Sequence, residues 1–255
     1  MTHGVTTGRR MLVLADSLAF HGPAHHELLT EPRLWPNVAA THAGLVPDVV
    51  ARAGWTSRDG WWALTQDPRV WTTLADPALA ALVLAVGSMD AAPASVPVWA
   101  REAIRYVRPG PVRRRVRSAY LSAHPHVVRA TSGRIRQLPQ PATEHYWART
   151  VAAVRHHRPD LLLVMLGPTP WKSAAYPSNR HYPTMLAAAR HFAQTHGLRF
   201  VDLEPIVAPM HAEGRGNPDG MHWDWPTHAG VGQAVAAALA DPGAPTPTGG
   251  AGSAR

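Results

Sequence analysis

The sequence predicts an α/β protein with a doubly wound, five-stranded parallel sheet, and three observations support this prediction. Five short apolar runs are separated by longer segments with helical patterns. The 255 residues suit one α/β domain with an insertion, and a chain of this length buries a sizeable core. Hydrophobic residues make up 45% of the chain, as in globular proteins.

Each apolar run has the length of a buried parallel strand. The expected strands are residues 11–15, 48–53, 81–86, 161–166 and 198–203. The expected helices are part of 18–44 and residues 60–75, 94–107, 143–157, 183–196 and 227–240. Ligands of such sheets bind at the carboxyl ends of the strands, so the residues just after each run are candidates for function.

We expect one domain over residues 10–241, with a flexible N-terminus at 1–9 and a disordered, Pro/Gly/Ala-rich tail at 242–255. The connection between the third and fourth strands is long for a compact domain. We expect a partly helical, cap-like insertion in it, at about residues 91–145, over the edge of the sheet.

The formal net charge is +8 and comes almost entirely from arginine, which favours anionic partners. The absence of cysteine excludes disulfides, a thiolate nucleophile and cysteine-based metal sites. The apolar run near the N-terminus is too short for a signal peptide, and no stretch approaches the ~20 apolar residues of a membrane span. We therefore expect a cytoplasmic protein without a transmembrane segment.

A serine near the N-terminus and an Asp–His pair near the C-terminus are the candidates for chemistry. Ser17 directly follows the first apolar run, in LADSLAFHG, where a serine on its own is more often a helix cap. Asp219 and His222 lie three residues apart in GNPDGMHW. The topology brings both segments to one edge of the sheet, so we interpret Ser17 as a nucleophile, His222 as its base and Asp219 as the group that orients the ring.

Three short blocks in this order resemble the SGNH (GDSL-type) esterases and acyltransferases. They are ADSL at 15–18, GSMD at 87–90 and DGMH at 219–222. The resemblance spans most of residues 11–240. It implies a flavodoxin-like SGNH hydrolase fold and an acyl group carried on Ser17.

The resemblance also implies an oxyanion hole, with two departures from the family pattern. Its backbone donors are Ser17 and the second-block position, which falls on Ser57, with Gly54 as a nearby candidate. Met89 stands where the family usually has an asparagine that donates to the oxyanion. Loss of one such donor typically lowers the rate ~10²–10³-fold, and Arg58 is a candidate replacement.

Longer segments resemble the actinobacterial diglucosylglycerate octanoyltransferases. These segments are LADSLAFHGP, EPRLWPN, GWTSRDGWWALTQDPRVW, GSMD, REAIRYVRP and GNPDGMHW. This resemblance implies transfer of octanoyl from its CoA thioester to a hydroxyl of diglucosylglycerate or glucosylglycerate, in methylglucose lipopolysaccharide biosynthesis. It makes acyl-CoA a co-substrate, with no bound cofactor, and gives the cap a role in excluding water.

The residue types fit an anionic donor and an anionic acceptor, because arginine binds phosphate and carboxylate in a bidentate manner. The arginine candidates are Arg58, Arg101, Arg105, Arg108, Arg113, Arg114, Arg115 and Arg117. The candidates for an acyl slot or a sugar platform are Trp55, Trp61, Trp62 and Trp71. Asp90 is a candidate for backbone N–H groups near the site or for the substrate. A solvated face for the arginines and a core position for the tryptophans are the ordinary alternatives.

Two further functions stay open, and no metal is expected. One is an esterase or thioesterase with the same triad and water as acceptor. The other is a non-catalytic module whose basic insertion binds nucleic acid or an anionic membrane, an alternative that Met89 keeps open. We expect no nucleic-acid partner, and the lack of aromatic residues between the arginines of 108–117 weighs against single-strand binding in particular. The histidines lack a convincing His/carboxylate spacing for a metal site.

Overall fold

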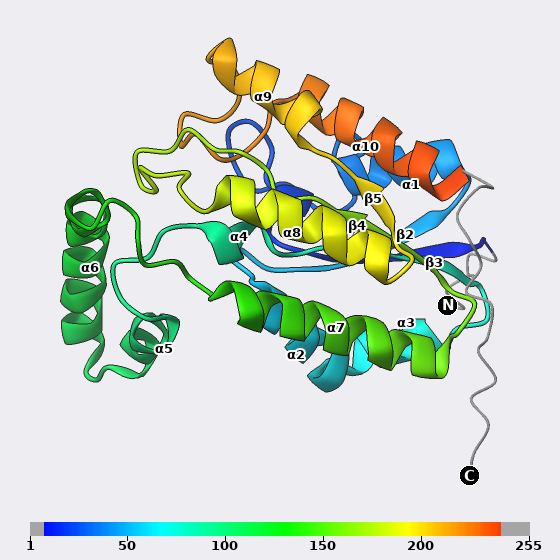
Figure 1. The fold of residues 1–255 in the computed structure, drawn as a ribbon, viewed down its shortest axis with the longest axis horizontal. Coiled ribbons are helices and arrows are strands. Elements are labelled where there is room, and N and C mark those ends of the chain that lie inside the picture. Colours follow the sequence, from blue (N-terminus) through cyan, green and yellow to red (C-terminus); the bar gives the residue numbers. More distant parts are fainter. Residues whose placement is uncertain (1–7, 241–255) are drawn as a thin grey trace, which may run out of the picture.

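The computed structural model describes residues 8–240, which form a fully parallel five-stranded sheet with helices on both faces (Figure 1). The strands follow the order β2 (Val46–Ala51), β1 (Arg10–Ala15), β3 (Leu79–Ala85), β4 (Leu162–Leu166) and β5 (Arg199–Val201). This order confirms the predicted doubly wound, flavodoxin-like sheet. The predicted tail at 242–255 and most of the predicted N-terminal segment lie outside the described residues.

Alternate strand residues enter two separate cores. In β1, Leu12 and Leu14 belong to one core, whereas Met11 and Val13 belong to the other. The first core is covered by α2 (Ser57–Gln66), α3 (Pro68–Ala75), α7 (Gln140–His157) and α8 (Tyr182–Thr195). The second is covered by α1 (Trp35–Ala43), α9 (Glu204–Ala212) and α10 (Trp225–Ala240).

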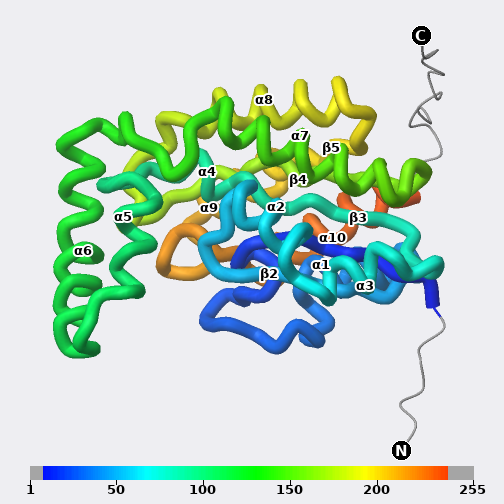
Figure 2. The backbone as a smooth tube through the Cα atoms, turned by 90° about the horizontal axis from the view of Figure 1, so that it is seen from below, coloured from blue at the N-terminus to red at the C-terminus, as the bar shows by residue number. Residues whose placement is uncertain are grey.

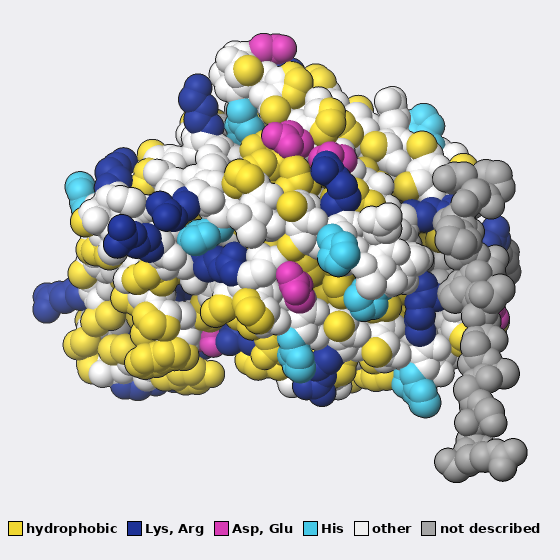
Figure 3. All heavy atoms as spheres, viewed as in Figure 1, with side chains coloured by type: hydrophobic (Ala, Val, Ile, Leu, Met, Phe, Trp, Pro, Cys, Tyr) yellow, Lys and Arg dark blue, Asp and Glu magenta, His cyan; other side chains and the backbone are white. Residues whose placement is uncertain are grey.

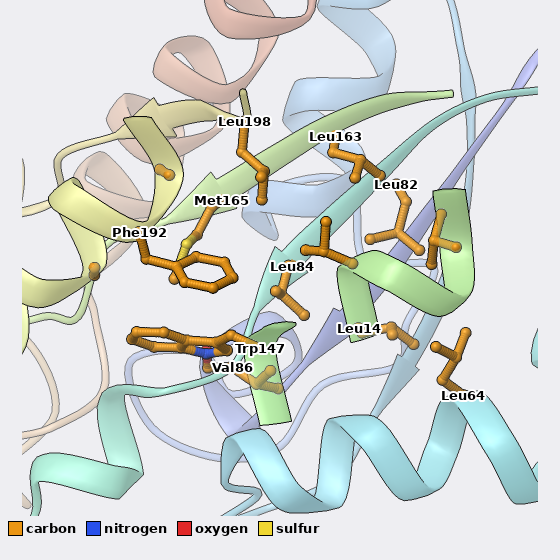
Figure 4. Close-up of a cluster of buried hydrophobic side chains, with 14 of the residues drawn as sticks. Leu14, Leu64, Leu82, Leu84, Val86, Trp147, Leu163, Met165, Phe192 and Leu198 are labelled. Carbon is orange, nitrogen blue, oxygen red and sulfur yellow. The ribbon is translucent and has the colours of Figure 1, made fainter. Parts of the chain in front are cut away.

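Aromatic side chains fill the first core above the strands. Figure 4 shows Trp147 of α7 and Phe192 of α8 beside Leu84 and Met165, with the two ring centroids 5.5 Å apart. The Trp147 indole also donates a hydrogen bond to the carbonyl of Val86, just beyond β3. This packing fixes the chain at the point where β3 ends and the third sequence block begins.

Two parts of the helix prediction are corrected. Residues 60–75 form two helices instead of one, because Pro68 lacks an N–H group and Asp67 caps the second helix through the N–H of Arg69. Helix α9 was not predicted. Its two prolines, Pro205 and Pro209, weaken the sequence signal, although proline is compatible with the first helical turn.

The connection between β3 and β4 carries additional helices before α7. They are α4 (Ser88–Ala91), α5 (Val98–Ala103), the 3₁₀ turn η2 (Ile104–Tyr106) and α6 (Gly110–Ala130). Figures 1 and 2 both place α5 and α6 side by side, beyond the end where β3 leads into α4. Within α6 only His124 and Val128 are buried. The insertion is thus partly helical, and its role as a closing cap stays a prediction.

The surface of this insertion combines apolar and arginine side chains. Figure 3 shows hydrophobic side chains gathered over α5 and α6, with arginines around them. Trp99 and Leu121 are 72% and 57% exposed. Among the helices of residues 8–240, none has the length and apolar character needed to cross a membrane.

Candidate active site

Ser17 lies where the central strand β1 ends. It is the first residue of a short 3₁₀ turn, η1 (Ser17–Ala19), and the buried Asp16 caps this turn by accepting the N–H of Leu18 at 2.9 Å. Burial raises the pKa of Asp16 to about 6. The cap fixes the backbone at Ser17, so the serine side chain has a defined direction at the carboxyl edge of the sheet.

His222 lies on a tight loop between α9 and α10. Gly220 adopts φ +72°, and a Cβ atom there would lie 1.9 Å from the carbonyl oxygen of Lys172, so only glycine fits. The carbonyl of Gly220 accepts the N–H of Lys172 at 2.8 Å, which ties the loop to the segment after β4. Asp219 Oδ1 accepts the N–H groups of Met221 and His222 at 2.8 and 3.1 Å. The loop is therefore closed on itself and aims the His222 ring.

The structure brings together Ser17, His222 and Asp219. His222 Nε2 lies 2.9 Å from Ser17 Oγ, and His222 Nδ1 lies 2.5 Å from Asp219 Oδ2. Partial burial raises the pKa of Asp219, but hydrogen bonds from the His222 ring and from two backbone N–H groups outweigh this and bring it to about 2. Asp219 is thus ionised at neutral pH. Such an array can pass a hydroxyl proton to the ring while a carboxylate stabilises the charged ring.

Two further histidines support this array. His21 stacks on His222 with ring centroids 3.7 Å apart, and its Nδ1–H donates to the carbonyl of Gly22 at 2.7 Å. Burial lowers the pKa of His21, so its ring stays neutral beside a His222 that has taken a proton. Sequence analysis missed His21, although it lies only four residues after Ser17.

His228 positions His21 through a hydrogen bond to its backbone carbonyl. The fully buried His228 ring accepts the N–H of Trp35 through Nδ1 at 3.3 Å and donates from Nε2 to the carbonyl of His21 at 3.1 Å. Burial lowers the pKa of His228 to about 4, which keeps this ring neutral at physiological pH. His228 is therefore a positioning residue that locks the turn after Ser17.

The structure contradicts the predicted oxyanion role of Ser57, and of the two roles considered for Asp90 it shows the hydrogen bond to a backbone N–H group rather than contact with a substrate. The Ser57 N–H, expected to hold an oxyanion, donates instead to Asp90 Oδ2 at 2.9 Å, and its hydroxyl donates to Asp90 Oδ1 at 2.6 Å. Thr143 also donates to Asp90 at 3.0 Å. Asp90 is fully buried, which raises its pKa to about 6, and so it cannot contact a substrate. Asp90 thus links α2, α4 and α7 through hydrogen bonds. The aspartate of the GSMD block therefore has a structural role in this protein.

A small hollow beside Ser17 has mixed walls. Its apolar lining comes from Met89, Trp171 and Met221, and its polar lining includes Ser88. Ser88 Oγ accepts the N–H of Thr169 at 3.3 Å, and its hydroxyl hydrogen has no acceptor among the described residues. Sequence analysis missed Ser88, although it lies inside the GSMD block.

Gly87 sets the backbone that presents Ser88 and Met89. It has φ +134°, and a Cβ atom at this position would lie 2.7 Å from the Trp147 ring. Only glycine allows the chain to turn from β3 into α4 against this indole. The glycine of the third block therefore has a steric role in placing the wall of the hollow.

Several of the predicted binding residues line a second and larger cleft, called the large cleft below. It has a volume of about 700 Å³ and is lined, among others, by Gly54, Trp55, Trp62, Arg101 and Arg105. Gly54 therefore does not face the hollow beside Ser17, which corrects its candidate role in the oxyanion hole.

The remaining candidates line neither the hollow nor the cleft. Arg58 pairs with Glu102 and lies 4.5 Å above the Trp62 ring, so it does not replace the missing oxyanion donor. Trp61 is covered by Arg149 and packs on the first core, and Trp71 meets His157 there. Arg108, Arg113, Arg114, Arg115 and Arg117 lie on or just before α6.

One group within residues 8–240 has the composition of a metal site, namely His21, Asp219 and His222, whose ligand atoms lie within 4.8 Å of one another. Both ring nitrogens of His222 already bond Ser17 and Asp219. A metal would have to replace one of these bonds. The expectation of a metal-independent site therefore stays a prediction.

Comparison with known proteins places these features in a family. A scan against models of protein families finds no match. The chain is 38% identical over 242 residues to a diglucosylglycerate octanoyltransferase of Mycolicibacterium hassiacum, covering 94% of this chain and 99% of the relative. It is also 38% identical over 244 residues to a diglucosylglycerate octanoyltransferase of Mycobacterium tuberculosis, covering 93% of this chain and 96% of the relative.

Solved structures share the fold at low sequence identity. A lipase/acylhydrolase from Enterococcus faecalis superposes with a TM-score of 0.57 at 14% identity, over 89% of this chain and 94% of that one. A lipolytic protein of the G-D-S-L family from Desulfitobacterium hafniense gives a TM-score of 0.54 at 11% identity, over 91% and 99% of the two chains. The chain thus belongs to the diglucosylglycerate octanoyltransferase family, a group of acyltransferases built on the SGNH (GDSL-type) hydrolase fold.

Proposed function

We propose that the protein transfers an octanoyl group from octanoyl-CoA to a hydroxyl of diglucosylglycerate or glucosylglycerate, through an acyl-Ser17 intermediate. The names of its relatives support the acyl group and the acceptor. The observation that carries the mechanism is the hydrogen-bonded array of Ser17, His222 and Asp219. The reaction is a step of methylglucose lipopolysaccharide biosynthesis in this proposal.

The first half-reaction acylates Ser17. Its Oγ attacks the carbonyl carbon of the thioester while His222 Nε2 takes the hydroxyl proton, and Asp219 stabilises the charged ring. The new C–O bond forms, the C–S bond breaks, and His222 returns the proton to the leaving CoA sulfur. The neutral state of His21 favours this step, because no second positive charge lies against the ring of His222.

The second half-reaction returns the enzyme to its starting state. His222 takes the proton of an acceptor hydroxyl, whose oxygen attacks the acyl carbon on Ser17. The ester of the acceptor forms, the bond to Ser17 Oγ breaks, and His222 returns the proton to the serine. Water in the same position would give hydrolysis, so transfer requires that the acceptor fill the site.

The oxyanion of both steps is held by the backbone N–H of Ser17 and by the hydroxyl of Ser88. The Ser17 N–H makes no hydrogen bond within the described part of the chain. The Ser88 hydroxyl lines the same hollow and has a free hydrogen, because Thr169 occupies only its oxygen. Ser88 thereby supplies the side-chain donor that Met89 lacks. Met89, Trp171 and Met221 form an apolar wall beside the carbonyl end of the acyl group.

Intact-protein mass spectrometry tests this proposal. Incubation with octanoyl-CoA should add one octanoyl group to the wild type and to Ser178→Ala, a control serine outside the hollow, but not to Ser17→Ala. Adding diglucosylglycerate should remove the adduct and form octanoylated acceptor. Equal labelling of Ser17→Ala would refute the acyl-serine step.

The esterase alternative gives a different result in the same experiment. Free octanoate would form at one rate whether or not the acceptor is present. The non-catalytic alternative is disfavoured by membership in a family of acyltransferases.

A further inference from the structure

One end of the large cleft lies just beyond the carboxyl end of β2, at the sheet edge where Ser17 also lies. Its lining begins with Arg52, which directly follows β2, and continues through α2 and the α5–η2 segment. The Arg52 N–H donates to the carbonyl of Ala15 at 3.4 Å, two residues before Ser17 on the neighbouring strand. The volume of about 700 Å³ lies within the range of small-molecule sites. The end of the cleft at Arg52 therefore lies on the strand next to the one that leads into Ser17.

Three aromatic rings line the cleft, namely Trp55, Trp62 and Tyr106. Trp62 and Tyr106 are 40% and 73% exposed, so their ring faces are accessible to a ligand in the cleft. The guanidinium of Arg58 lies 4.5 Å from the Trp62 ring centre and braces this ring. Such rings offer flat apolar faces with polar edges, to which the C–H face of a sugar ring is complementary.

The charged side chains that line the cleft favour a ligand with a single negative charge over a ligand with several. Asp59, Asp67 and Glu102 line it together with Arg52, Arg101 and Arg105. Three carboxylates disfavour the clustered phosphates of CoA, because like charges repel. They are good acceptors for sugar hydroxyls, and the arginines are donors for a single carboxylate. The lining thus fits a ligand with many hydroxyls and one negative charge.

We propose that this cleft is the acceptor site, which binds the glucose rings of a glucosylated glycerate on Trp62 and Tyr106 and its carboxylate on Arg105. The inference rests on the proposed function, because it assigns the acceptor of that reaction to a place. Glu102 lies 4.0 Å from Arg105 and holds Arg58, and so it orders the arginines of the wall. The CoA donor then reaches Ser17 from another direction.

Direct binding tests the site without turnover. Calorimetry with diglucosylglycerate and Ser17→Ala protein should show about tenfold or greater loss of affinity when Trp62→Ala or Tyr106→Ala is added. Trp99→Ala is the matched control, because Trp99 is 72% exposed on α5 but lies outside the cleft lining. Equal affinities for Trp62→Ala, Tyr106→Ala and the control would overturn the proposal.

A neutral analogue tests the role of the arginine. Arg105→Gln should weaken binding of diglucosylglycerate but not of a glucosylglycerol without the carboxylate. Arg129→Gln, at an exposed position on α6 outside the cleft lining, should change neither. Equal loss for both ligands would overturn the carboxylate assignment.

Steady-state kinetics separate the acceptor from the donor. Trp62→Ala should raise KM for the acceptor, and a rise in KM for octanoyl-CoA alone would assign the cleft to the donor instead. Failure of the proposed function would be visible separately, as a wild type that forms no acyl-enzyme with octanoyl-CoA.

Discussion

The hollow beside Ser17 and the large cleft are built in opposite ways. The hollow depends on Ser17, His222 and Asp219, whose contacts are 2.9 and 2.5 Å and whose backbones are fixed by the strand end and a closed loop. The cleft depends on exposed rings and long side chains, several of them from the insertion. Proton transfer demands positions fixed to a fraction of an ångström, whereas sugar binding tolerates adaptable surfaces.

This difference separates chemistry from recognition, and the following experiments probe it in order of expected effect. Changes in the hollow should alter the rate of acylation while acceptor binding persists. A change at His228, which supports the hollow from the protein interior, should alter the free energy of unfolding. Removal of metal should alter nothing.

The largest effect is expected for His222→Ala. Loss of the base should lower kcat about 10⁴-fold or more, because members of such an array act as a unit. Calorimetry should still show diglucosylglycerate binding. His25→Ala, which removes an exposed histidine ring outside the lining of the hollow, is the control. A variant with wild-type turnover would break the assignment of the hollow as the reaction centre.

A smaller loss is expected for Ser88→Ala. Removing one oxyanion donor should slow acylation of Ser17 about 10²–10³-fold, measured by rapid-quench mass spectrometry. Ser88→Thr, which keeps the hydroxyl, should recover part of the rate. Ser178→Ala is the control, because Ser178 also accepts a backbone N–H, that of Arg180, on the protein surface. A wild-type acylation rate in Ser88→Ala would remove Ser88 from the mechanism.

His228 tests the support of the hollow through pH. Its pKa is about 4 in the folded protein and about 6.5 when unfolded, so the unfolded state binds more protons between these values and stability falls on acidification. Between pH 7.5 and 5 the wild type should lose roughly 2 kcal/mol of unfolding free energy relative to His228→Asn. Denaturant titrations at both pH values measure this, and a constant difference between the proteins would contradict the neutral buried ring.

The smallest effect is expected for metal removal. His21, Asp219 and His222 are close enough to share an ion, but their hydrogen bonds already serve the array. Treatment with EDTA followed by gel filtration should leave the rate unchanged. A loss that a divalent metal restores would show that the hollow is a metal site.

The sequence predicted the sheet and the Ser17–His222–Asp219 contact because both depend on local patterns and on topology. Five apolar runs set the strands, and the carboxyl ends of parallel strands must share an edge. The use of Ser57 could not be foreseen, because it depends on the buried Asp90 and on Thr143 of α7, far away in sequence. Likewise, Trp61 and Trp62 are adjacent in sequence but face the core and the cleft, and only packing distinguishes them.

The base and the nucleophile are 205 residues apart in sequence. During translation, the segment bearing Ser17 is therefore complete long before the loop of His222 leaves the ribosome. A nascent chain that ends before residue 222 has the Ser17 hydroxyl without this proton acceptor, so we expect it to be inert toward thioesters. The nucleophile and its base can therefore meet only after both segments have been synthesised and folded together.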